Sequence, residues 1–111
     1  MMNEMLEYKG YLGSVEYSSV DEIFYGRIIG ISDRITFDGD GVKSLKRNFE
    51  EAVDDYLESC AELGKEPEQP YRGYFDVRIS PELHKKLVIF STTHKRSLNT
   101  VVEEAIRSYV V

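Results

Sequence analysis

The stretch that decides the fold lies at residues 74–81 and reads Tyr74-Phe75-Asp76-Val77-Arg78-Ile79-Ser80-Pro81. Apolar and polar residues alternate over residues 74–79, which predicts one short strand ended by the Ser-Pro pair. A lone strand cannot satisfy its own backbone hydrogen bonds, so it has to pair with another strand. The simplest partner is the same strand from a second copy of the chain.

Two helical patterns follow this strand. The first is expected from Pro81 to Thr93, with Ser80 as its N-cap and an apolar stripe of Leu83, Leu87 and Phe90. The second is expected from Leu98 to the C-terminus, with Ser97 as its N-cap. The turn between them, residues 92–96, has no glycine, so a residue with a side chain is expected to adopt a positive φ.

The second of these helices is too apolar for a module of some forty residues to bury alone. Its stripe consists of Leu98, Val101, Val102, Ala105, Ile106 and Tyr109. Two intertwined copies would bury it and would also pair the two strands into an antiparallel ribbon. A two-stranded ribbon fits the major groove of DNA, so residues 71–111 are predicted to be a ribbon-helix-helix module for DNA binding and dimerisation.

This module has an expected contact set for each role. The dimer contacts are expected at Phe75, Val77, Ile79, Leu98, Val102 and Ile106. The DNA contacts are expected on the outward strand face and at a helix N-terminus, where backbone N–H groups suit a phosphate: Tyr74, Asp76, Arg78, Ser97, Leu98 and Asn99. Arg78 could equally form a surface salt bridge, and Tyr74 could merely flank the ribbon. The Asp76 carboxylate is repelled by phosphate, which leaves operator specificity open.

The first part of the chain predicts an α+β layer domain over residues 1–66. Strands are expected at residues 8–17, 23–29 and 34–37, and the turn Asp38–Gly41 ends the third. A helix is expected from about Gly41 to Leu63, with Asp40 as N-cap and Gly64 as the C′ residue. Its apolar positions are Val42, Leu45, Phe49, Val53, Tyr56, Leu57 and Cys60. A three-stranded antiparallel sheet with one long helix follows, joined to the second domain by the linker at residues 65–70.

Charge is distributed unevenly between the two parts. Residues 1–70 carry seven Lys/Arg and sixteen Asp/Glu, a net charge of −9, whereas residues 71–111 carry seven and four, a net charge of +3. The asymmetry indicates two different partners, with phosphate tolerated only by the second part. A single cysteine, no apolar run long enough for a membrane span and no signal-peptide pattern predict a soluble cytoplasmic protein.

Several of these strings resemble the HicB-like antitoxins of toxin–antitoxin systems, whose C-terminal domain is of the Arc/MetJ type. The resemblance is carried by Val77-Arg78-Ile79-Ser80-Pro81-Glu82-Leu83-His84, by Ser97-Leu98-Asn99, and by shorter strings between Tyr8 and Leu57, so it extends over nearly the whole chain. It implies a partial RNase H-like first domain that binds a small basic ribonuclease toxin of the HicA type. It also implies a homodimer that represses its own operon.

The acidic outer face of the long helix is the expected toxin surface by charge complementarity, although such a face is commonly only solvated. Its proposed contact residues are Glu51, Asp54, Asp55 and Glu58. No cofactor, no metal site and no catalytic residue are expected, because His84, His94 and Cys60 have no metal-ligand spacing and Asp38 and Asp40 are explained by the turn. The alternatives are a stand-alone regulator with a ligand-sensing first domain, and a degenerate nuclease.

Overall fold

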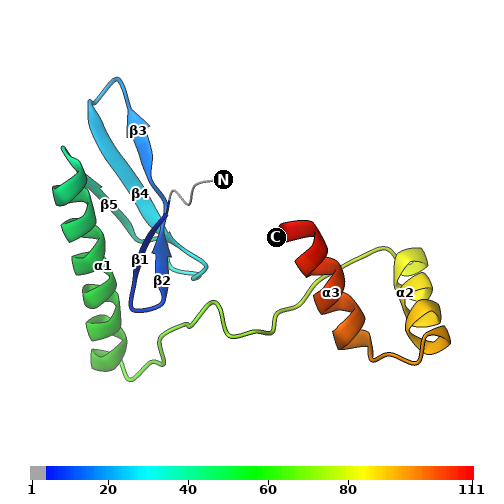
Figure 1. Ribbon diagram of the computed structural model, residues 1–111. Coiled ribbons are helices and arrows are strands. Elements are labelled where there is room, and N and C mark those ends of the chain that lie inside the picture. The colour runs from blue at the N-terminus through cyan, green and yellow to red at the C-terminus, as the bar shows by residue number, and fades with distance from the viewer. Residues whose placement is uncertain (1–4) are drawn as a thin grey trace. The chain divides into compact units, whose positions relative to one another are not determined.

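The computed structural model describes residues 5–111 and shows an α+β chain with an antiparallel sheet and three helices (Figure 1). The chain divides into two compact units, the first ending at Tyr74 and the second comprising Phe75–Val111. All strands and the longest helix belong to the first unit, and the second unit contains the other two helices.

The sheet of the first unit has five short strands. These are β1 (Leu6–Tyr8), β2 (Tyr11–Gly13), β3 (Glu16–Ser18), β4 (Ile23–Ile29) and β5 (Thr36–Gly39). All pairings are antiparallel; β4 pairs with β2 and β3 along one edge and with β5 along the other, and β1 pairs with β2. The prediction of three strands was therefore wrong in number, and the third strand begins and ends two residues later than expected.

The expected first strand is divided at two places for different reasons. Lys9 and Gly10 have φ angles of 53° and 83°, and they form the two-residue turn between β1 and β2. Such a turn needs positive φ at both central positions. Further along, β2 and β3 keep one register on β4, and the Ser14 hydroxyl interrupts the ladder by accepting the Arg27 N–H at 3.0 Å.

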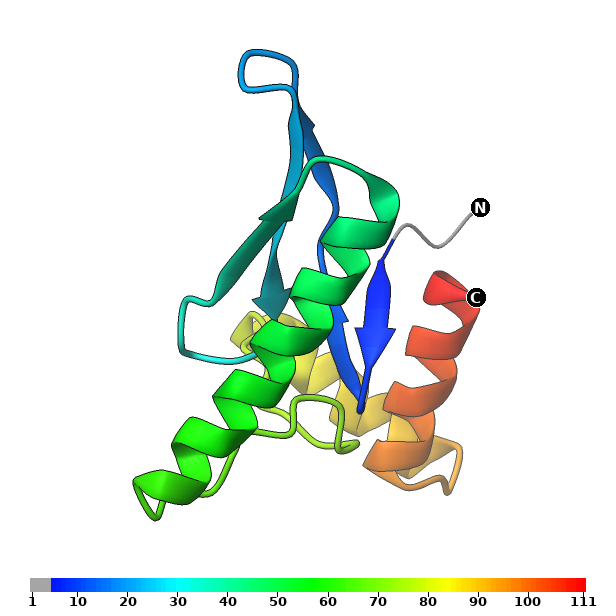
Figure 2. The ribbon, with the colours of Figure 1, turned by 90° about the vertical axis from the view of Figure 1, so that its left-hand side faces the viewer.

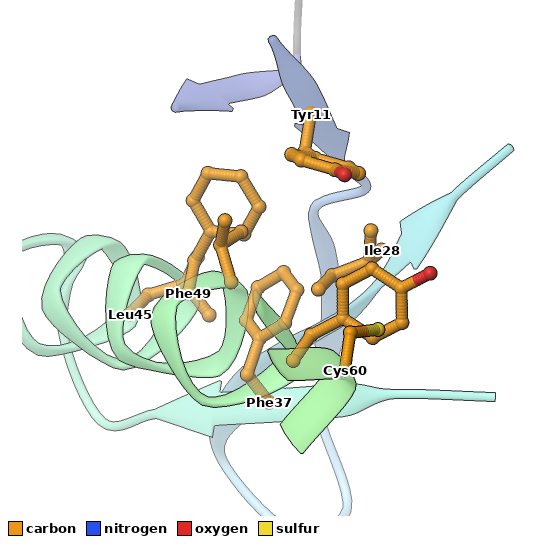
Figure 3. Close-up of a cluster of buried hydrophobic side chains, with 8 residues drawn as sticks. Tyr11, Ile28, Phe37, Leu45, Phe49 and Cys60 are labelled. Atoms are coloured by element: carbon orange, nitrogen blue, oxygen red, sulfur yellow. The ribbon is translucent and has the colours of Figure 1, made fainter. Parts of the chain in front are cut away.

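The core of the first unit lies between the sheet and α1 (Val42–Glu62), which covers one face of the sheet. Figure 3 shows side chains from both layers meeting there, with the Phe37 and Phe49 rings 5.2 Å apart between their centres. The buried helix positions are Leu45, Phe49, Val53, Tyr56 and Cys60, which confirms the predicted periodicity except at its start. Val42, the first residue of the helix, is largely exposed.

The two ends of α1 differ in how well they were predicted. Gly41, not Asp40, is the N-cap, and its N–H donates to the Ser44 hydroxyl at 3.1 Å. At the other end Gly64 has a φ of 67°, and the following N–H, from Lys65, donates to the Cys60 carbonyl at 2.8 Å. This is the glycine-terminated helix end that was expected at Gly64.

The helices of the second unit begin and end close to the predicted residues. They are α2 (Pro81–Thr93) and α3 (Leu98–Val110), and each begins with a serine whose hydroxyl accepts a backbone N–H. Ser80 accepts from Leu83 at 3.1 Å and Ser97 from Thr100 at 3.0 Å. Lys95, in the turn between the helices, has a φ of 54°, which confirms that a residue with a side chain adopts the left-handed conformation.

The segment expected as a strand over residues 74–79 pairs with no other strand in the part of the chain that the structure describes. All six side chains are exposed. A strand is defined by hydrogen bonds to a neighbouring strand, and the sheet of the first unit does not include this segment. The single chain therefore does not form the predicted strand.

Gly26 is expected to be essential to the sheet, because a Cβ there would lie 1.8 Å from the carbonyl oxygen of Ser14, which connects β2 and β3 beside β4. Gly26→Ala should therefore lower the free energy of unfolding by roughly 3 kcal/mol or more. The matched control is Gly41→Ser, because a Cβ at Gly41 has no atom within 4 Å and serine is a favourable N-cap. Urea denaturation of both variants measures the difference in the free energy of unfolding. Equal stabilities would contradict the close approach of Gly26 to the Ser14 carbonyl.

Candidate interaction surfaces

The four carboxylates proposed for toxin contact are all exposed on the outer side of α1, but they are not equivalent. Asp54 is already occupied, because Lys9 Nζ lies 2.8 Å from one of its oxygens and the Tyr8 hydroxyl donates to the other at 3.1 Å. The hydrogen bond from Lys9 lowers the pKa of Asp54, and the same bond raises the pKa of Lys9. Asp54 is therefore a fixed anion whose charge is partly neutralised from within its own unit.

Glu51 and Asp55 face a polar groove between α1 and β5. The groove has a volume of about 350 Å³ and is also lined by Asp38 of β5 and by Asn48. Asn48 Nδ2 donates to the Asp38 carbonyl at 2.6 Å, which caps a backbone acceptor at this edge of the sheet. Within residues 5–111, none of the carboxylates of Asp38, Glu51 and Asp55 forms an ion pair.

Asp38 was not among the expected contact residues. Its sequence context, Asp-Gly-Asp-Gly, is explained by turn formation, and only the pairing of β5 with β4 brings it beside α1. The groove therefore gathers three unpaired negative charges from two elements. A basic side chain entering it would meet carboxylates on both sides.

The linker between the predicted domains is held to the first unit by hydrogen bonds to Glu68. The backbone of Glu68 is held at both ends, because its carbonyl accepts from the Tyr11 hydroxyl at 2.5 Å and its N–H donates to the Tyr56 hydroxyl at 3.0 Å. The Glu68 carboxylate accepts from the Ser32 hydroxyl at 2.5 Å and from the Ser32 N–H at 3.1 Å. Gly30 allows Pro70 to approach so closely that a Cβ there would lie 2.8 Å from the proline ring.

These contacts change the acidity of the groups that make them. Burial raises the pKa of both Tyr11 and Tyr56, so their hydroxyls stay protonated and keep a proton to donate. The two hydrogen bonds from Ser32 lower the pKa of Glu68. Residues 67–71 consequently belong with the first unit, whereas the sequence predicted only a short polar linker over residues 65–70.

The residues proposed for DNA contact are all exposed in the second unit and at its junction with the first. Neither Asp76 nor Arg78 forms an ion pair within the described residues, so both charged groups point to solvent in the single chain. The guanidinium of Arg72 lies 5.3 Å from the centre of the Tyr74 ring, a cation–π distance. At the start of α3, the Ser97 hydroxyl caps the helix, and Leu98 and Asn99 follow with exposed side chains.

The second unit has no buried apolar side chain among the described residues, and its one buried side chain is that of Ser91. Phe75, Val77 and Ile79 are 74%, 62% and 44% exposed. The three dimer residues proposed on α3 are also exposed, though less than Phe75 and Val77: Leu98, Val102 and Ile106. Two short helices with so little buried surface cannot hold each other by hydrophobic packing alone.

Comparison with known families adds one finding at this point. Residues 56–106 match the model of the HicB family. The match covers somewhat less than half of the chain: the end of α1, the linker, the expected strand, α2 and most of α3. All the residues proposed for DNA contact and dimerisation lie inside it, and of the proposed toxin contacts only Glu58 does. Comparison with curated proteins and with solved structures gave no match.

Among residues 5–111, no three His, Cys, Asp or Glu side chains gather as a metal site would require. No helix in the same residues is long and apolar enough to cross a membrane.

The attachment of the linker through Glu68 should depend on pH. A carboxyl whose pKa is lower in the folded state stabilises that state above its unfolded pKa of about 4.3, and the contribution is lost as the pH falls through the folded value. Glu68→Gln should therefore lower the Tm at pH 7, and the difference from the unsubstituted chain should shrink as the pH is lowered below about 4. Glu66→Gln, at an exposed neighbouring glutamate, is the control. A Tm difference that persists undiminished at pH 3 would show that the carboxylate charge is not what holds the linker.

Proposed function

We propose that this chain is an antitoxin that binds and neutralises a small basic ribonuclease toxin of the HicA type and represses its own operon as a ribbon-helix-helix dimer. The observation that carries the proposal is the match of residues 56–106 to the HicB family. The negative first part and the positive second part of the chain support it independently, because they suit a basic protein and a nucleic acid respectively.

The dimer is supported by the exposed apolar surface of the second unit. Residues 74–79 pair with no strand among residues 5–111, and the side chains of Phe75, Val77 and Ile79 are exposed to solvent. A second copy would satisfy both needs at once, by pairing the two segments as an antiparallel ribbon and by covering the apolar faces of α2 and α3. In that ribbon Tyr74, Asp76 and Arg78 would share the outward face.

Operator binding would combine this outward face with the beginning of α3. Backbone N–H groups at Leu98 and Asn99 lie at a helix N-terminus, which is a favourable position for a phosphate. The positive charge of residues 71–111 supplies the non-specific part of the attraction. Arg78 is the residue proposed to contact a base edge, and Asp76 limits how many phosphates this face accepts.

Toxin binding is proposed at the outer side of α1 and the groove beside it. The free carboxylates of Asp38, Glu51 and Asp55 are the natural partners for basic side chains, with Glu58 further along the same helix and Asp54 already bridged to Lys9. We also propose that the layer of α1 on the sheet is a partial RNase H-like fold, here serving as a binding scaffold and not as an enzyme.

One observation favours the alternative of a regulator whose first domain senses a ligand. A cleft of about 500 Å³ lies in the first unit between the β1–β2 turn, α1 and the linker. Its walls include Tyr11, Leu57 and Tyr71, with Lys9 and Arg72 as cations. Saturable binding of a small molecule together with the lack of a neighbouring toxin gene would favour this reading over the antitoxin.

The toxin proposal predicts an order of effects among the acidic residues. The double change Glu51→Lys and Asp55→Lys should weaken binding of the toxin encoded next to this chain by at least about tenfold, because two unpaired carboxylates are reversed. Asp54→Asn should weaken binding less, since Lys9 already offsets that charge. Titration calorimetry of the purified pair measures both, with Asp21→Lys, in the loop after β3, as the control for a general change of charge. Similar affinities for all three variants would remove this face from the toxin site.

The DNA proposal predicts that Arg78→Ala weakens operator binding by roughly 1–3 kcal/mol, the cost of one bidentate base contact. The dimer and the toxin affinity should not change, because Arg78 is exposed and forms no ion pair with the residues that the structure describes. Mobility-shift titrations at one fixed salt concentration measure the loss. Arg107→Ala is the control, since Arg107 is an exposed arginine already paired with Glu103. Unchanged affinity of Arg78→Ala would exclude it from the operator contacts.

A further inference from the structure

The outer face of α1 is divided by the sign of its charges along the length of the helix. Lys43 and Arg47 lie in its first two turns, Asp54 and Glu58 lie in its second half, and all four side chains are exposed. Spacings of four, seven and four residues return to nearly the same side of a helix, so the four charges form one stripe. We call these four residues the α1 stripe; Figure 2 views α1 from its outer side.

This order of charges does not stabilise the helix itself. A helix is stabilised by acidic residues near its start and basic residues near its end, yet α1 has no acidic residue in its first turn and no basic residue in its last. Nor do these charges pair along the helix: within residues 5–111, the only ion pair of the stripe is the one from Asp54 to Lys9. Lys43, Arg47 and Glu58 are therefore available to another molecule.

We propose that in the toxin-free protein the α1 stripe pairs antiparallel with the α1 stripe of a second copy of this chain. A helix that is basic at one end and acidic at the other is complementary to itself when one copy is reversed. With the twofold axis passing between Glu50 and Glu51, Lys43 lies opposite Glu58 and Arg47 lies opposite Asp54. Symmetry repeats each contact.

The second copy is available because of the dimer in the proposed function, on which this inference rests. Exposed ion pairs contribute little by themselves, and the glutamates at the axis repel one another. A copy held nearby by the second unit raises the effective concentration enough for such a weak contact to form. Asp54 and Glu58 also belong to the proposed toxin surface, so the toxin and the second helix compete for the same charges.

Cross-linking of the full-length chain tests the pairing. Glu51→Cys places a thiol close to the axis, and Cys60→Ala removes the one natural cysteine, which is buried. A short bismaleimide should link two copies of this variant. Adding Lys43→Glu and Arg47→Glu should lower the yield by at least about fivefold, because the stripe then carries one sign only. Adding Asp54→Lys and Glu58→Lys as well reverses the whole stripe and should restore the yield.

The restored yield is the decisive result, because a stripe that served only the toxin or only DNA would not regain self-pairing when all four charges are reversed. A fully reversed variant that links no better than the half-reversed one overturns the proposal, as does a yield that 1 M salt leaves unchanged. Sedimentation of the same samples distinguishes failure of the helix pairing from failure of the proposed dimer. A dimer that does not cross-link refutes only the helix pairing, whereas a monomer also refutes the dimer of the proposed function.

Discussion

The second unit cannot bury its own apolar side chains, and most of what is proposed for this chain depends on that constraint. Phe75, Val77 and Ile79 belong to a segment that pairs with no strand among the described residues, and no apolar side chain of α2 or α3 is buried. Hydrophobic burial is the main favourable contribution to folding, so a unit with almost none of it is incomplete as a single copy. A second copy is the proposed partner, because it would supply both a strand to pair with and a cover for these side chains.

The first unit, in contrast, buries its own apolar side chains. Its core is closed by a helix on one face of the sheet, and the hydroxyls of Tyr11 and Tyr56 reach past that core to hold the backbone of Glu68. Since residues 67–71 are fixed by these bonds and by Ser32, the freedom between the two units is confined to the few residues that follow. Gly73, with a φ of 96°, lies in this short stretch. In the proposed function this short joint would connect a toxin-binding unit to a DNA-binding unit.

Local rules explain which parts of this structure could be predicted from the sequence. The helices were predictable because their signals are local: an apolar periodicity in α1, and the caps Ser80, Ser97 and Gly64. The strands of the sheet were harder to predict. The break at Ser14 depends on a hydrogen bond from the Arg27 N–H on another strand. The turn at Lys9 and Gly10 lies inside a segment that otherwise reads as one continuous strand. Asp38 beside Glu51 and Glu68 beside Ser32 are contacts between distant residues, and no spacing rule indicates them.

The inner and outer sides of α1 have separate roles, and these roles determine which substitutions each side tolerates. The inner side is set by Leu45, Phe49 and Val53, whose packing tolerates little variation in volume. The outer side makes few contacts within its own unit, so a change of charge there disturbs no buried group. Affinity for a toxin or for a second helix can therefore be altered through the outer charges while the fold stays fixed by the inner ones. Because both proposed partners use Asp54 and Glu58, a substitution that strengthens one of them also shifts the balance against the other.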